Sequence, residues 1–262
     1  MSGAVHTQCQ GQLAFVTLSH PGKFNAMSRQ MWRELRQTFT TLHADAALRC
    51  IVLRGEGGHF CAGGDIAEYP EFRHDEAGLR EFHENDVWGG LQAVLDCDVP
   101  VIAQIEGNCM GAGVEIACCC DIRVAAESAR LGAPIARLGF PMAPREAALV
   151  LREAGALSMR EMLLEAGVLT AQQMLTRGFL HRVVTDAPAE ALATATRIQA
   201  LAPGAARLNK QTLRALQAAP TSDALAALLA RDPYGYADSA EHREGINAFL
   251  AKRPAAFSIL NS

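Results

Sequence analysis

Two apolar runs that each enter a glycine-rich turn constrain the fold of this chain more than any other feature. The first run covers residues 50–53, and its turn covers residues 60–66. The second run covers residues 101–105 and enters a turn at residues 107–115. Short apolar runs bounded by glycine are typical of buried strands, and a helical pattern follows the second turn directly. Strands that alternate with helices predict an α/β fold.

Periodicity predicts the remaining elements. Ser28 is expected to cap a helix that carries Met31, Trp32, Leu35, Phe39 and Leu42 at helical spacing. The charged segment 68–84 predicts either a mobile loop or an exposed helix. Other strands are expected at residues 13–18 and 121–125, and other helices at residues 87–95, 114–120, 158–164, 171–175, 190–201, 205–216, 224–229 and 241–252.

Composition excludes several classes of protein. The chain has 262 residues, enough for one sizeable core, and its net charge of -4 with scattered basic residues argues against nucleic-acid binding. No apolar run approaches the roughly 18 to 20 residues that span a bilayer, and we expect no membrane contact and no secretory signal. The eight cysteines lack zinc-type spacing. We expect Cys118, Cys119 and Cys120 to be buried thiols in a reducing compartment, the cytoplasm.

The two turns have a chemical interpretation and a structural one. Backbone N–H groups from two bare turns can point at one oxygen and hold the negative charge that develops on a thioester carbonyl. Glu115, directly after the second turn, would then serve as an acid/base group. The alternative is that glycine only turns the chain and that Glu115 only complements the helix dipole. Neither turn has the spacing of a dinucleotide site, a P-loop or a serine nucleophile elbow.

The chain resembles the crotonase family, which includes enoyl-CoA hydratases and isomerases. The resemblance covers nearly the whole chain. The matching segments are residues 25–27, 60–66, 100–103, 107–115, 120–123, 129–134, 178–180, 244–245 and 249–254.

This resemblance implies a spiral of repeated ββα units as an α/β core over residues 1–195. A helical region, residues 196–262, would form a homotrimer or a dimer of trimers. It implies an acyl-CoA thioester as substrate, with coenzyme A as part of that substrate and no separate cofactor or metal. The implied catalytic groups are Glu115 and the backbone N–H groups of Gly64 and Ala112. The implied substrate contacts are Lys23, Ala26, Ala62, Gly63, Asp65, Ile66, Gly111, Pro134 and Ile135. For Lys23 the alternative is a solvated surface lysine, and Lys252 and Arg253 could reach phosphates but are expected to be exposed charges.

One position departs from the family pattern. A hydratase of this family uses a second glutamate after the proline of residues 131–134, and here that residue is Ile135. Isoleucine exchanges no proton, and a drier pocket would raise the pKa of Glu115. Three alternatives stay open: hydration or isomerisation with Glu115 as the acid/base group, decarboxylation or thioester hydrolysis, and CoA binding without catalysis. Arg145 and Glu146 are expected as an exposed pair at a helix start, and the weaker pocket candidates are His59, Glu68 and Arg137.

Overall fold

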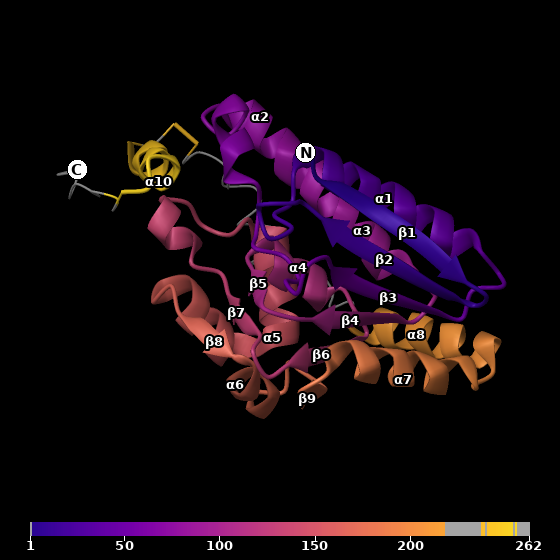
Figure 1. Cartoon of the computed structure of the whole chain (residues 1–262). Coiled ribbons are helices and arrows are strands. Elements are labelled where there is room, and N and C mark those ends of the chain that lie inside the picture. Colours follow the sequence, from indigo (N-terminus) through magenta and orange to yellow (C-terminus); the bar gives the residue numbers. More distant parts are fainter. Residues whose placement is uncertain (1, 218–236, 239, 254, 256–262) are drawn as a thin grey trace.

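The computed structural model describes residues 2–217, 237–238, 240–253 and 255. A six-stranded sheet with the order β1-β2-β3-β4-β6-β9 forms its centre (Figure 1). β1 pairs antiparallel with β2, and all later pairs are parallel. The strands are β1 Ala4–Gln10, β2 Leu13–Ser19, β3 Cys50–Gly55, β4 Val101–Ile105, β6 Ile122–Ala126 and β9 Arg182–Val184.

Helices cover both faces of this sheet. α1 (Arg29–Ala44) and α3 (Trp88–Asp96) pack together on one face, while α7 (Ala187–Gln199) packs on β3, β4 and β6 from the other (Figure 1). Side chains of β4 are buried along its whole length. This double coverage explains why the parallel strands are continuous apolar runs rather than alternating ones.

Smaller elements connect and flank these layers. A second sheet has the order β5-β7-β8, in which β5 lies within the second glycine turn and pairs parallel with β7. Its strands are β5 Asn108–Met110, β7 Arg130–Gly132 and β8 Val168–Thr170. The remaining helices are η1 Ile66–Glu71, α2 Glu76–Glu81, η2 Phe82–Val87, α4 Ala112–Cys118, η3 Ile135–Leu138, α5 Pro144–Leu164, α6 Ala171–Thr176, α8 Pro203–Gln217 and α10 Ala240–Leu250.

The predicted Ser28 cap is confirmed. The Ser28 side chain accepts a hydrogen bond from the N–H of Met31 at 3.2 Å, at the start of α1. All five apolar residues predicted for one face of this helix are buried. Their burial against the sheet and α3 contributes on the order of 1.5–3 kcal/mol for each large side chain.

Several sequence expectations need correction. Segment 68–84 is neither a plain loop nor one exposed helix, because it contains the end of η1, all of α2 and the start of the π-helical η2, with Phe72, Arg73 and Phe82 buried. The helix predicted at residues 158–164 is the second part of α5, and the non-helical backbone of Gly155 (φ 77°, ψ 157°) separates it from a first part, beginning at Pro144, that was not predicted. The helix expected at residues 241–252 is α10, and its apolar residues do not share one environment, because Ile246 is buried whereas Phe249 and Leu250 are exposed. The helix expected at residues 224–229 lies outside the described residues.

The boundary expected at residue 195 falls inside α7. Beyond it, α8 is tied to the sheet by Lys210, whose Nζ donates to Asp121 Oδ2 at 2.7 Å and to the carbonyl of Val99. The division into two units stays a prediction. None of the described helices is long and apolar enough to cross a membrane. The residues Cys118, Cys119 and Cys120 are buried free thiols, as expected.

Candidate active site

The two glycine turns lie side by side. The N–H of Cys61 donates to the carbonyl of Asn108 at 2.9 Å, and the N–H of Met110 donates to the carbonyl of Cys61 at 2.8 Å. A Cβ added to Gly111 would lie 3.7 Å from the Cα of Gly63. Segments that are far apart in the sequence therefore present their bare backbones at one place.

Both turns need glycine for its backbone freedom. Gly63 has φ 109° and Gly111 has φ 46° with ψ -108°. Residues with a Cβ rarely adopt such angles. Gly111 precedes the first residue of α4, and its unusual angles aim the start of that helix at Gly63.

The backbone leaves the N–H groups of Gly64 and Ala112 out of its regular pairing. In the bridge between Met27 and Gly64, the carbonyl of Gly63 accepts from Met27 and the N–H of Asp65 donates to Met27. The Gly64 N–H takes no part in this bridge. Ala112 is the first residue of α4, where an N–H has no partner within the helix. Each predicted oxyanion donor therefore comes from a backbone position that the fold does not itself satisfy.

The loop before α1 is hydrogen-bonded to the first turn and to the residues just before it. Asn25 is 3% exposed and adopts φ 61°, and its side-chain amide donates to the carbonyls of Glu56 and His59 at 2.8 and 2.7 Å. Its Oδ1 accepts from the N–H of His20 at 3.1 Å. Ala26 is buried beside it, and the N–H of Ala62 donates to the carbonyl of Phe24.

Lys23 and Asp65 form an ion pair at the edge of this loop. Lys23 Nζ lies 2.6 Å from Asp65 Oδ2, with the lysine side chain 42% exposed and the aspartate 6%. Asp65 also caps η1 by accepting from the N–H of Ala67, and Ile66 follows half-buried. Asp65 thus has a structural task, and it holds the Lys23 ammonium next to the first turn.

Glu115 lies in the first turn of α4 and is partly buried. Desolvation and, to a smaller extent, the charge of Glu146 raise the pKa of Glu115 to about 8, and Arg73 opposes this shift. A carboxyl group with this pKa is protonated for most of the time at neutral pH and can donate a proton.

Glu146 is not the exposed residue that the sequence predicts. It is 2% exposed in the first turn of α5, and α5 packs against α4. Its Oε1 lies 2.9 Å from Nδ1 of His83 on η2. Arg145, its neighbour, is exposed as expected and lies over the ring of Trp88. Two carboxyl groups, Glu115 and Glu146, therefore begin two helices that pack together.

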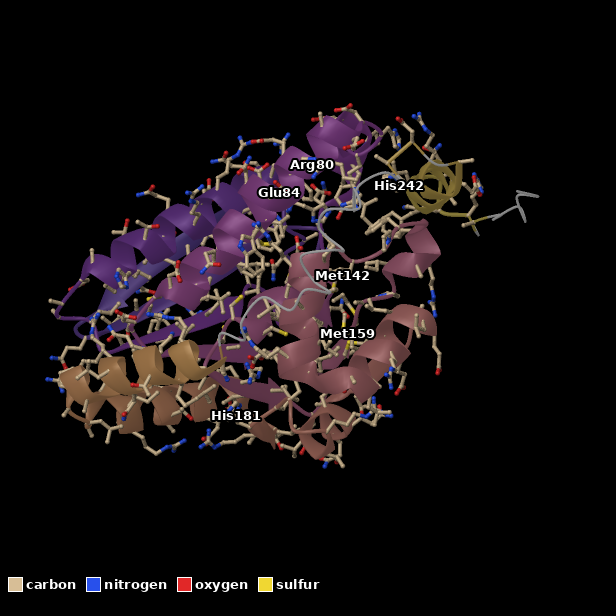
Figure 2. The ribbon with its side chains drawn as sticks, turned by 180° about the vertical axis from the view of Figure 1, so that it is seen from behind. Arg80, Glu84, Met142, Met159, His181 and His242 are labelled. Atoms are coloured by element: carbon tan, nitrogen blue, oxygen red, sulfur yellow. The ribbon has the colours of Figure 1, made fainter. Side chains whose placement is uncertain are left out.

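A buried arginine lies behind this pair. Arg73 is 1% exposed, and its guanidinium lies 4.5 Å from the ring centre of Tyr69 and 4.0 Å from that of Phe140. Its Nη1 lies 3.3 Å from Nε2 of His83, and its Nε donates to Nε2 of His242 at 3.4 Å. His242 comes from α10, which lies beside α2 and away from the main sheet (Figures 1 and 2).

Tyr69 joins this cluster to the first turn. Its side chain is buried in η1, and its hydroxyl lies so close to Gly64 that a Cβ added there would collide with it. A tyrosine hydroxyl therefore lies against the backbone of one predicted oxyanion donor. The sequence analysis missed Tyr69, Arg73 and His83, which lie in the segment interpreted as loop or exposed helix.

Ile135 and Pro134 stand at the start of η3. Pro134 is the N-cap residue, and Ile135 is half-buried and packs against the main core. The weaker candidates have structural contacts: His59 Nδ1 accepts from the N–H of Asn108, and Glu68 accepts from the N–H of Arg29. The remaining weak candidates are Arg137, which donates to the carbonyl of Ala166, and Arg253, which pairs with Glu244, while Lys252 is exposed.

Comparison with known proteins shows the family to which the chain belongs. The model of the family described as enoyl-CoA hydratase/isomerase matches residues 8–259. The chain belongs to this family. Membership identifies it as an enzyme of the enoyl-CoA hydratase/isomerase kind with the crotonase fold, in a family that acts on acyl-CoA thioesters.

Individual relatives match over almost their full length. A probable enoyl-CoA hydratase of Mycobacterium bovis is 30% identical over 250 residues, which are 94% of this chain and 95% of the relative. The crystal structure of an enoyl-CoA hydratase/carnithine racemase from Magnetospirillum magneticum superposes with a TM-score of 0.80 at 36% identity, covering 97% and 95% of the two chains. Methylmalonyl-CoA decarboxylase in complex with 2-nitronate-propionyl-CoA superposes with a TM-score of 0.85 at 27% identity, covering 99% and 100%.

Proposed function

We propose that this enzyme hydrates or isomerises an enoyl-CoA thioester through an enolate held by the N–H groups of Gly64 and Ala112. Glu115 acts as the general acid/base group. The enolate oxygen carries the negative charge as the double bond shifts, and two fixed N–H donors stabilise that charge without reorganisation. Loss of one such donor typically costs on the order of 10²–10³ in rate.

The contact between the two glycine turns supports this proposal more than any other observation. The two turns are hydrogen-bonded to each other, and a Cβ added to Gly111 would lie 3.7 Å from the Cα of Gly63. The residues that follow these glycines, Gly64 and Ala112, are therefore suited to donate to one oxygen. Glu115 follows the second position after one turn of helix, and its pKa of about 8 suits proton transfer near neutral pH.

The substrate's coenzyme A portion would lie along the first turn and the loop before α1. The proposed contacts are Lys23, Ala26, Ala62, Gly63, Asp65 and Ile66, with Gly111, Pro134 and Ile135 near the acyl group. Lys23 supports this placement because its ammonium is half-exposed and is held by Asp65 beside the turn. No cofactor beyond the substrate's own coenzyme A is needed for this chemistry.

Decarboxylation is a second candidate, and Ile135 favours it. Loss of carbon dioxide from a malonyl-type thioester generates the enolate directly, so the oxyanion hole matters more than a pair of carboxyl groups. Methylmalonyl-CoA decarboxylase is among the structures that superpose on this chain. In this reaction Glu115 would protonate the enolate carbon.

A panel of thioesters separates these functions. Crotonyl-CoA, longer 2-enoyl and 3-enoyl thioesters and methylmalonyl-CoA would be incubated with the wild type and with Glu115→Gln. We expect turnover of at least one enoyl thioester and a loss of about 10²-fold or more in the variant. Carbon dioxide release from methylmalonyl-CoA alone would favour the decarboxylase, and release of free coenzyme A would favour a hydrolase. Tight binding without turnover of any panel member would overturn the proposal.

We also propose a homotrimer or a dimer of trimers in the cytoplasm. Leu151, Leu157 and Leu164 of α5 are 48%, 67% and 80% exposed, which suits contact with another subunit. All eight cysteines are free, which suits a reducing compartment. Light scattering after size-exclusion chromatography would measure the oligomeric mass, and a monomer would contradict the proposed trimeric assembly.

A further inference from the structure

The site holds a second buried carboxyl group that the family pattern does not predict. Glu146 lies on α5, eleven positions beyond Ile135. It is 2% exposed, and burial of a carboxyl group is costly unless hydrogen bonds or charges compensate. The observed compensation comes from His83 on a different helix, η2.

The hydrogen bonds around His83 fix the proton positions. An arginine N–H can only donate, so Nε2 of His83, at 3.3 Å from Arg73 Nη1, must be the acceptor. The ring proton of a neutral imidazole then sits on Nδ1, and Nδ1 donates to Oε1 of Glu146 over 2.9 Å. Burial lowers the pKa of His83, which agrees with a neutral ring. This hydrogen bond fixes the orientation of the Glu146 carboxyl group.

The two carboxyl groups have different surroundings. Glu146 lies in the first turn of α5, which packs on the α4 helix of Glu115, and it accepts a hydrogen bond from His83. The pKa of Glu115 is raised to about 8, mainly by desolvation and to a smaller extent by Glu146. Two neighbouring carboxyl groups in such different environments can serve as one acid and one base.

We propose that Glu146, oriented by His83, is the second acid/base group of this enzyme and does the work of the glutamate that Ile135 replaces. This inference rests on the proposed function. In hydration, Glu146 takes a proton from water as the water oxygen bonds to Cβ of the enoyl group. The π electrons of the carbon–carbon double bond then move toward the thioester oxygen. Glu115 then delivers its proton to Cα as the thioester carbonyl re-forms. Transfer of the proton from Glu146 to Glu115 returns both groups to their starting states.

Two reactions of the full-length enzyme test this division of labour. Hydration of crotonyl-CoA needs both groups, whereas exchange of the α-proton of butyryl-CoA in D₂O needs only Glu115 and the oxyanion hole. We expect Glu146→Gln to lower the hydration kcat by at least about 10²-fold and to lower exchange by at least about tenfold less than hydration. Glu115→Gln should lose both reactions. Glu153→Gln, a matched change of a largely buried glutamate on the same helix, should keep both.

Other outcomes of these measurements would overturn either the role of Glu146 or the proposed function. Hydration by Glu146→Gln within threefold of wild type would overturn the inference, and so would equal loss of hydration and exchange. A wild type that catalyses neither reaction would instead overturn the proposed function. If Glu146→Gln does not fold, His83→Phe and His83→Asn replace it. The first removes the donor and should lower kcat about tenfold with unchanged KM, and the second restores an N–H donor and should recover the rate. Equal kcat in these two variants would overturn the role of His83.

Discussion

Oε1 of Glu146 lies 2.9 Å from Nδ1 of His83, and this contact ties the first turn of α5 to the η2 helix. The same glutamate lies in the first turn of α5, which packs on the α4 helix of Glu115, and its charge helps to raise the pKa of Glu115. The charged and titratable groups of the candidate site therefore come from three helices, α4, α5 and η2. The behaviour of this site can be tested through stability as well as through rate.

Glu115 should make the protein less stable at alkaline pH. Its folded pKa of about 8 lies above the ordinary value of 4.5. A group of this kind leaves stability intact below about pH 4.5 and weakens the fold as pH rises through 8. Between pH 5 and 8.5, the wild type should lose about 2–4 kcal/mol of unfolding free energy that Glu115→Gln does not lose. Urea denaturation at several pH values measures this difference, and parallel curves for the two proteins would contradict it.

His242 should make the attachment of α10 sensitive to acid. Burial lowers the pKa of His242 to about 4, the hydrogen bond to the carbonyl of Ala237 opposes this shift, and Arg73 adds to it. A histidine with a depressed folded pKa contributes stability above about pH 6.5, and this stability is lost as pH falls toward 4.

The comparison of wild type with His242→Gln isolates this effect. The variant cannot take up the proton, so it should be spared about 1–2 kcal/mol of the acid-induced loss between pH 6.5 and 4. Thermal unfolding at these pH values is the measurement. His6→Gln, on the largely exposed strand β1, is the control, and it should follow the wild-type curve. An acid response that is the same in all three proteins would rule out His242 as its source.

Gly111→Ala should destabilise the protein by about 1–3 kcal/mol, because the backbone angles of Gly111 strain any residue with a Cβ. It should also move the Ala112 N–H and lower activity. Gly204→Ala in α8 is the matched control, since a Cβ there meets nothing within 4 Å. The control should be neutral or stabilising by up to about 1 kcal/mol. Equal melting temperatures for the two variants would show that the Gly111 turn tolerates a side chain.

Asn25→Ala should cost about 2–3 kcal/mol, because three hydrogen bonds of a buried amide are lost and their partners are left unsatisfied. The loop that carries Lys23 would loosen, so KM for the thioester should rise more than kcat falls. Asn85→Ala removes an exposed amide with one partner, Glu81, and should change stability by less than about 0.5 kcal/mol. An Asn25→Ala protein with wild-type stability and KM would refute this role for the amide.

The sequence alone was sufficient wherever local signals decide structure. Ser28 and the apolar spacing after it predict α1, because a cap and one apolar face specify a helix locally. The apolar run at residues 101–105 predicts β4 with its observed bounds. The glycine turns and Glu115 were found because backbone freedom and a family motif are both visible in the chain. The three-residue strands β5, β7, β8 and β9 were not predicted, since so short a run has no recognisable period.

Tertiary structure decided which charged residues belong to the site. Arg73, His83 and Glu146 all look like solvated surface residues in the sequence, because charged side chains are usually exposed. Packing of α4 on α5, and of α10 on η1 and η3, buries them and brings them together. Burial depends on contacts between segments up to 169 residues apart, as between Arg73 and His242. The sequence thus predicted the two glycine turns and Glu115, and the fold decided which further charged residues are buried near them, because burial depends on contacts between distant segments.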